Sequence, residues 1–144
     1  MILINVIIKT KNLNTKLLLT ASTLFLGVIG VGFSFFPKEI LMYLDIDATQ
    51  MLTFMAQILG ALFLGFAMMN WMARGSIIGG IYNRPIAIGN FMHFALGAIT
   101  LLKITFKAEV HVGIIISLTV FYTLFALSFA YVFFTNPTML GSEN

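Results

Sequence analysis

The chain has 144 residues, of which 60% are hydrophobic and 9% charged, and its mean hydropathy is +1.02. A soluble domain of this size buries only about 68–70% of its unfolded surface and carries about 25% charged residues, so a soluble domain and a disordered tail are excluded. The net charge of +3 rests on eight basic and five acidic residues, too few for a nucleic-acid-binding face. There is no cysteine, which excludes disulfides and thiolate metal sites. The composition is that of an integral membrane protein.

Uncharged stretches predict four membrane spans, because a hydrocarbon core about 30 Å thick needs roughly 20 apolar residues of helix. We expect these spans near residues 17–36, 48–73, 86–102 and 110–135. Asp47 stands where the second span needs an N-cap, and Pro85 suits the first turn of the third. The fold class is therefore all-α: a polytopic, antiparallel four-helix bundle forming one domain over residues 1–144.

Apolar residues within 38–47 predict a short segment along the membrane interface. The first span is interpreted as a retained helix, because the triplet Ala21-Ser22-Thr23 lies too early in it to be a signal-peptide cleavage site.

Lysine and arginine flank the spans unequally. Five lie on the side of both termini, including Arg74 and Arg84, and three lie on the other side: Lys38, Lys103 and Lys107. Cytoplasmic loops carry the excess of basic residues, so we expect both termini in the cytoplasm of a bacterial cell with the chain in its inner membrane.

Small and polar residues recur at helical spacing on one face of each span, which is how helices pack closely in lipid. The first span carries Thr20, Thr23, Gly27, Gly30 and Ser34; the second Ala56, Gly60, Ala67 and Asn70; the third Asn90, His93, Gly97 and Thr100; the fourth Gly113, Ser117 and Ser128. These faces suit a bundle or an oligomer equally. Gln57, near the middle of the second span, needs an interhelical partner.

His93 is the one ionisable side chain placed well inside a span, about 10 Å from residue 86. Intramembrane ionisable groups are candidate functional sites. Depth matching puts Ser128 beside His93, and Asn70 beside Asn90. The predicted candidate site for a ligand or lipid headgroup comprises Asn70, Arg74, Arg84, Asn90, His93 and Ser128. Three interpretations stay open: helix association, ligand binding, and catalysis or proton transfer.

Arg74 and Arg84 bracket an apolar connection with three glycines. An anion could lie between the two guanidiniums and the amides of Gly79 and Gly80. The alternative is a tight cytoplasmic turn that follows the positive-inside rule. The glycine spacing is not that of a P-loop, so no nucleotide is expected.

All five carboxylates lie outside the spans: Glu39, Asp45, Asp47, Glu109 and Glu143. Cation-coupled transport commonly uses buried acids, and general acid–base catalysis commonly uses paired ones. We expect no metal site, no cofactor and no catalytic residue, and His93 alone is a narrow basis for chemistry.

Residues 59–65 (LGALFLG) run on to Asn70-Trp71, and Arg84-Pro85 and Asn90-x-x-His93-Phe94 follow. In size, four-span layout and this glycine-rich second helix, the chain resembles the small bacterial membrane proteins grouped as DoxX-like. The resemblance implies a four-helix membrane fold, and it implies no activity and no site residue.

The function favoured by these features is a non-catalytic accessory or interaction protein whose partners are the lipid bilayer and a larger membrane complex or further copies of itself. One alternative is a binder or carrier of a lipophilic or anionic small molecule at the polar cluster. Another is a lipid-modifying enzyme with His93 as base and Arg74 and Arg84 holding an anionic head.

Overall fold

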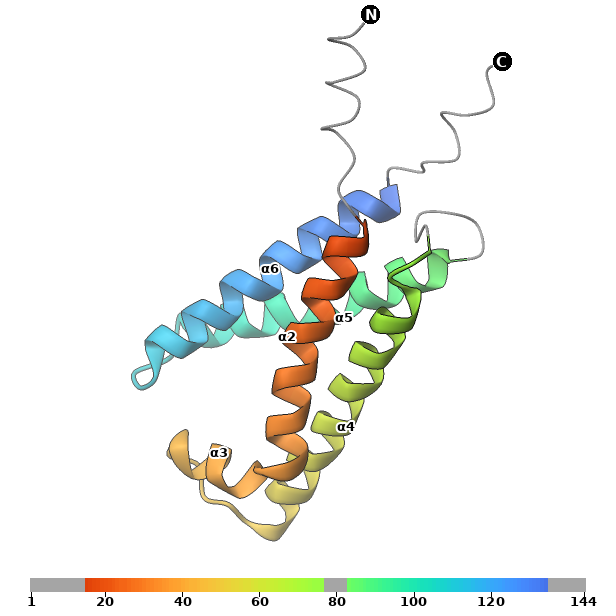
Figure 1. The fold of residues 1–144 in the computed structure, drawn as a ribbon. Helices are drawn as coiled ribbons and strands as arrows, with labels where there is room; N and C mark the ends of the chain where they lie inside the picture. Colours follow the sequence, from red (N-terminus) through yellow and green to blue (C-terminus); the bar gives the residue numbers. More distant parts are fainter. Residues whose placement is uncertain (1–14, 77–82, 135–144) are drawn as a thin grey trace, which may run out of the picture.

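The computed structural model describes residues 15–76 and 83–134, and this part of the chain is helical throughout, apart from its connections (Figure 1). The helices are α2 (Thr15–Phe35), α3 (Pro37–Tyr43), α4 (Gln50–Ala73), α5 (Arg84–Thr105) and α6 (Val112–Phe134). Four of them, all but α3, are long and apolar enough to cross a membrane. Each predicted span overlaps one of these four, with ends that differ by three residues at most. The prediction of a four-helix membrane protein is confirmed.

Local sequence sets the helix ends. Pro37 begins α3 and Pro85 lies in the first turn of α5, where a missing N–H leaves no hydrogen bond unmade. The prediction that Asp47 caps the second span is wrong. The cap is Thr49, whose Oγ1 accepts a hydrogen bond from the Leu52 N–H at 3.3 Å. The Asp47 carbonyl instead accepts from the Thr49 N–H at 2.8 Å, which holds Asp47 in the turn before the helix.

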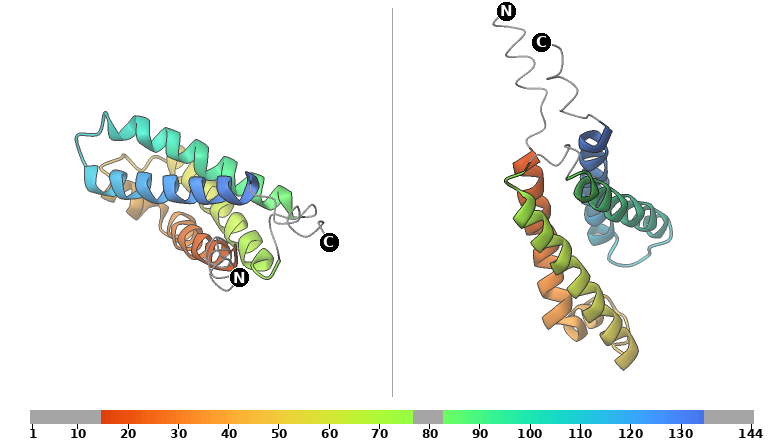
Figure 2. Two further views of the ribbon diagram at one scale, coloured as in Figure 1. Left: turned by 90° about the horizontal axis from the view of Figure 1, so that it is seen from above. Right: turned by 90° about the vertical axis from the view of Figure 1, so that its right-hand side faces the viewer.

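The bundle consists of two antiparallel hairpins, α2 with α4 and α5 with α6, as Figure 1 shows. Between the hairpins, α2 contacts α6 and α4 contacts α5. Figure 1 and the right-hand view of Figure 2 show that the hairpins approach each other near the end where α2 begins and α6 ends, and diverge away from it.

Glycine lets α2 and α4 pack backbone to backbone. A Cβ added to Gly60 would lie 2.6 Å from the Ser34 nitrogen, and one added to Gly30 would lie 2.9 Å from the Leu64 nitrogen. The Thr23 hydroxyl donates to the Ala67 carbonyl at 3.2 Å, which adds a hydrogen bond between the same two helices. The predicted small-residue faces of the first two spans therefore pack against each other.

Aromatic side chains hold α5 to α6. The Phe94 ring is stacked with Phe125 at 4.7 Å and Phe129 at 5.7 Å between centroids, and the Tyr122 ring covers Gly97. The buried face of α6 is Thr119, Tyr122, Ala126, Phe129 and Val132. The predicted face through Gly113 and Ser117 is wrong for the first turns of α6, because both residues are exposed and the bulky face is buried instead.

A second contact joins the hairpins at their diverging end. The Asp45 carboxylate follows α3 and lies 2.9 Å from the His111 Nε2 in the connection between α5 and α6. Both residues have left-handed backbone, with φ of 57° and 52°. The Tyr43 ring lies 5.6 Å from the imidazole, so this contact has an aromatic flank.

Candidate functional site

Two asparagines from different hairpins form a reciprocal amide pair. The Asn70 Nδ2 donates to the Asn90 Oδ1 at 2.8 Å, and the Asn90 Nδ2 donates to the Asn70 Oδ1 at 2.7 Å. Both residues are fully buried. The pair joins α4 to α5, as depth matching predicted, and lies within a turn or two of the ends of both helices at the connection between them.

A serine that the sequence analysis did not select completes this cluster. The Asn70 Nδ2 also donates to the Ser22 Oγ at 3.0 Å, and the Ser22 hydroxyl donates to the Leu19 carbonyl at 3.0 Å. The spacing of Ser22 in the sequence indicates that it is buried, because with Leu19 and Leu26 it forms a fully buried stripe on α2. The predicted small-residue face passes through the neighbouring Thr23 instead.

The cluster leaves no amide donor unused. Each Nδ2 carries two N–H groups. Those of Asn70 go to Ser22 and Asn90, and those of Asn90 go to Asn70 and the Ile86 carbonyl, the last at 2.9 Å. This buried network joins α2, α4 and α5, and it leaves none of the four amide N–H groups free to donate to a ligand.

His93 does not join the asparagine pair. Its imidazole lies in a cage of aromatic rings that we call the His93 cage: Phe66 stacked at 4.7 Å, Phe94 at 5.1 Å, Phe63 at 5.4 Å and Tyr122 at 5.7 Å between centroids. The Nε2 atom is buried and has no hydrogen-bond partner within residues 15–76 and 83–134. The rings pack directly around the imidazole, which favours a packing role over contact with a ligand.

Ser128, predicted beside His93, uses its hydroxyl within its own helix. It donates to the Leu124 carbonyl at 2.8 Å, one turn back on α6. Hydroxyls in membrane helices often make this local bond, which satisfies the group without an interhelical partner.

The two arginines each lie over an aromatic ring. The Arg74 Cζ is 3.1 Å from the centre of the Trp71 ring, and the Arg84 Cζ is 5.3 Å from the centre of the Phe133 ring. Cation–π contacts of this kind hold a guanidinium at a membrane interface through its face. Gly79 and Gly80, the other half of the predicted anion site, lie outside the described residues.

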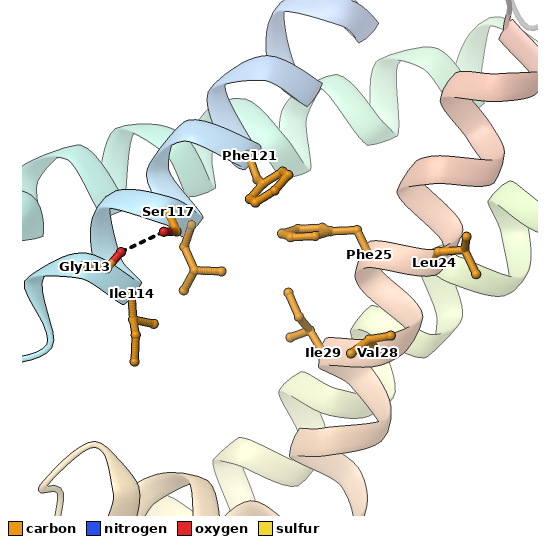
Figure 3. Close-up of a pocket in the computed structure, with 9 residues that line it drawn as sticks. Leu24, Phe25, Val28, Ile29, Gly113, Ile114, Ser117 and Phe121 are labelled. Atoms are coloured by element: carbon orange, nitrogen blue, oxygen red, sulfur yellow. Dashed lines mark hydrogen bonds between the residues drawn. The ribbon is translucent and has the colours of Figure 1, made fainter.

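An apolar groove separates the hairpins where α2 and α6 diverge (Figure 3). It has a volume of 610 Å³, and its walls include Phe25 and Ile29 of α2 and Ile114 and Phe121 of α6. The rings of Phe25 and Phe121 face each other across it at 5.5 Å. The Ser117 hydroxyl in its wall donates to the Gly113 carbonyl at 2.8 Å, so the groove offers apolar contact and no reactive group.

Among the described residues, no three His, Asp or Glu side chains come together where they could hold a metal ion. No protein-family model, curated protein or solved structure matches the chain. The resemblance to DoxX-like proteins therefore stays a prediction. The fold defines the class: an integral membrane protein with four apolar helices, in which interior polar side chains hydrogen-bond backbone carbonyls and, in the asparagine cluster, one another.

Proposed function

We propose that this protein is an accessory membrane protein without chemistry of its own, and that it works by binding a partner transmembrane helix. The observation that carries this proposal is the position of Gln57. It is the eighth residue of α4, about 10 Å along the helix axis, and its side chain is exposed. No group in residues 15–76 or 83–134 hydrogen-bonds its amide.

An unpaired amide is costly in hydrocarbon, where it has no water to bind, by several kcal/mol on most scales. The interhelical partner expected for Gln57 is therefore not supplied by the described part of this chain. A helix from another subunit would supply it.

Small residues beside Gln57 allow such a helix to approach closely. Ala61 and Gly65 follow one and two turns along α4, and both are exposed. A Cβ added to Gly65 would meet nothing within 4 Å, in contrast to Gly60, which is packed against α2. We call Gln57, Ala61 and Gly65 the Gln57 face. Small residues together with one amide are the combination by which membrane helices associate.

The two alternative functions have less support. A carrier or enzyme centred on the predicted cluster would use Asn70, Asn90 and His93. The two amides are already saturated by Ser22 and each other, and the His93 cage surrounds the imidazole with rings. The two amides therefore have no free N–H donor for a substrate, and the imidazole Nε2 is buried among the rings.

The test is native mass spectrometry of the protein extracted gently from its own membrane. We expect a stoichiometric complex, with a second copy or another membrane protein, that is lost in Gln57→Leu and in Gly65→Leu. Gln50→Leu is the matched control, since it makes the same chemical change at the first residue of α4 and should retain the complex. A monomer in wild type, or a small-molecule adduct lost in His93→Ala, would overturn the proposal.

We also propose that the membrane is a bacterial inner membrane and that both termini are cytoplasmic. Arg74 and Arg84 lie at the end of the molecule where α2 begins and α6 ends (Figure 1), which supports this orientation by the positive-inside rule. The chain has no cysteine, so single cysteines are unambiguous reporters. In intact cells, Glu109→Cys should react with a membrane-impermeant maleimide and Ser76→Cys should not; the reverse pattern would invert the topology.

A further inference from the structure

A second groove runs between α2 and α4, on the outside of their hairpin. Its walls include Thr23, Gly27 and Val31 of α2 and Leu64, Ala67 and Trp71 of α4. Its volume is 740 Å³, within the range of about 300–1,000 Å³ typical of ligand pockets. Both walls are membrane-spanning helices, so the groove opens to the hydrocarbon of the bilayer.

The interior of this groove suits a hydrocarbon chain. Thr23 has the hydroxyl in its wall, and that group already donates to the Ala67 carbonyl at 3.2 Å. The remaining wall consists of aliphatic side chains, one glycine, the thioether of Met68 and the indole of Trp71. A polar ligand would therefore lose its hydration without gaining hydrogen bonds from the side walls.

One end of the groove carries a cation. Trp71 is a wall residue there, and the Arg74 guanidinium is stacked on its ring, 3.1 Å from the ring centre to Cζ. A guanidinium that lies over a ring by its face keeps the N–H donors of its edge free for other groups, and these donors are the ones that bind a phosphate. Arg74 follows the last residue of α4, at the depth where a helix leaves the hydrocarbon.

No carboxylate competes for this cation within the described ranges. The acids there belong to the connections at the other end of the hairpins: Glu39, Asp45, Asp47 and Glu109. Lys16 and Arg84 lie instead at the same end as Arg74, so the local charge at this end of the groove is positive.

We propose that the groove between α2 and α4 binds one acyl chain of an anionic phospholipid, whose phosphate pairs with Arg74. The apolar length selects the chain and the guanidinium selects the anionic head. The site needs no protein partner, so it stands or fails independently of the Gln57 face.

Trp71 makes the site directly observable, because it is the one tryptophan of the chain and lies in the groove wall. The purified protein is reconstituted in phosphatidylcholine vesicles with a minor fraction of phosphatidylglycerol. Bromine atoms, which quench indole fluorescence on contact, are placed on the acyl chains of one lipid or the other. We expect brominated phosphatidylglycerol to quench Trp71 with about a five-fold preference over phosphatidylcholine, the size expected for one cation at an anionic surface.

Two variants and a matched control separate this site from general charge effects. Arg74→Gln should abolish the preference for phosphatidylglycerol while the chain still enters the groove. Gly27→Leu, which fills the groove, should reduce quenching by both lipids. Arg84→Gln removes a cation at the same end that lies over the Phe133 ring instead, and should leave the preference unchanged. Circular dichroism checks that each variant remains helical.

Three results would overturn the proposal. Equal quenching by the two lipids in wild type would show that Arg74 does not bind the anionic headgroup. An equal loss in Arg74→Gln and Arg84→Gln would show attraction to the whole basic end in place of a site. Absence of quenching by either lipid would show that lipid does not enter the groove.

Discussion

The amide pair between Asn70 and Asn90 gives the sharpest prediction about stability. Asn70→Leu removes three hydrogen bonds, two to Asn90 and one to Ser22. Interhelical hydrogen bonds in membrane proteins average about 0.6 kcal/mol each, which gives roughly 2 kcal/mol for the three. The variant also leaves the Asn90 amide and the Ser22 hydroxyl buried without Asn70, a further destabilisation of about 1–3 kcal/mol.

The double variant separates a hydrogen-bonded pair from simple packing. Asn90→Leu alone should destabilise the protein by a similar amount, because it leaves the buried Asn70 with Ser22 only. Replacing both asparagines removes donor and acceptor together, and such paired replacements are close to neutral. We therefore expect the double variant to lose less stability than the two single variants added together, by at least about 3 kcal/mol, because the two shared bonds are lost only once and neither asparagine is left buried without its partner.

The free energy of unfolding can be measured by titrating detergent-solubilised protein with dodecyl sulfate. Near-ultraviolet circular dichroism of the aromatic core and Trp71 fluorescence report the loss of tertiary packing. Asn70→Leu combined with Thr100→Leu is the control, because the Thr100 hydroxyl bonds the Leu96 carbonyl of its own helix at 2.9 Å, and this pair should be additive. Additivity for the asparagine pair as well would refute the reasoning.

Three further predictions concern packing and backbone, and the same titration checks each. Gly60→Ala should destabilise the protein by about 1–3 kcal/mol, because the added Cβ would clash with α2. Gly65→Ala places its Cβ in open space and should stabilise the protein by up to about 1 kcal/mol. Equal effects of the two substitutions would contradict this packing. His93→Phe should keep or raise stability, since it retains an aromatic ring and removes a buried nitrogen that no described residue hydrogen-bonds. His93→Ala should lose about 3 kcal/mol of stability. Loss of a bound partner or ligand in His93→Phe would indicate that His93 has a binding role in place of a packing role. Asp45→Gly should be more stable than Asp45→Ala by about 1 kcal/mol, because both lose the bond to His111 and only alanine is strained at φ 57°; equal stabilities would argue against strain there.

Depth along the helix was sufficient to predict the contact between Asn70 and Asn90. Asn70 and Asn90 flank one connection, so they lie at the same depth whatever the arrangement of the helices, and the structure brings them together. The same reasoning predicted that Ser128 lies beside His93, and the structure gives the two side chains different partners. The two side chains point in different directions around their helix axes. The imidazole lies among aromatic rings, and the Ser128 hydroxyl donates to the Leu124 carbonyl of its own helix. Rise per residue follows from sequence alone, whereas the facing of a side chain depends on which helix packs beside it.

The sequence by itself determined that this is a membrane protein, how many helices cross, and where they begin and end within three residues. Those properties follow from the free-energy cost of exposing charge or unpaired backbone to hydrocarbon. This cost depends only on the residues of each segment, so it can be judged one segment at a time. Only the tertiary structure decided which small faces are used. Gly30 and Gly60 pack α2 against α4, while Gly65 is exposed on the same face of α4 as Gln57. In lipid, burying an apolar face drives little association between helices, so which helices pair depends on how well their surfaces fit. That fit is a property of two helices together and cannot be judged from the sequence of one.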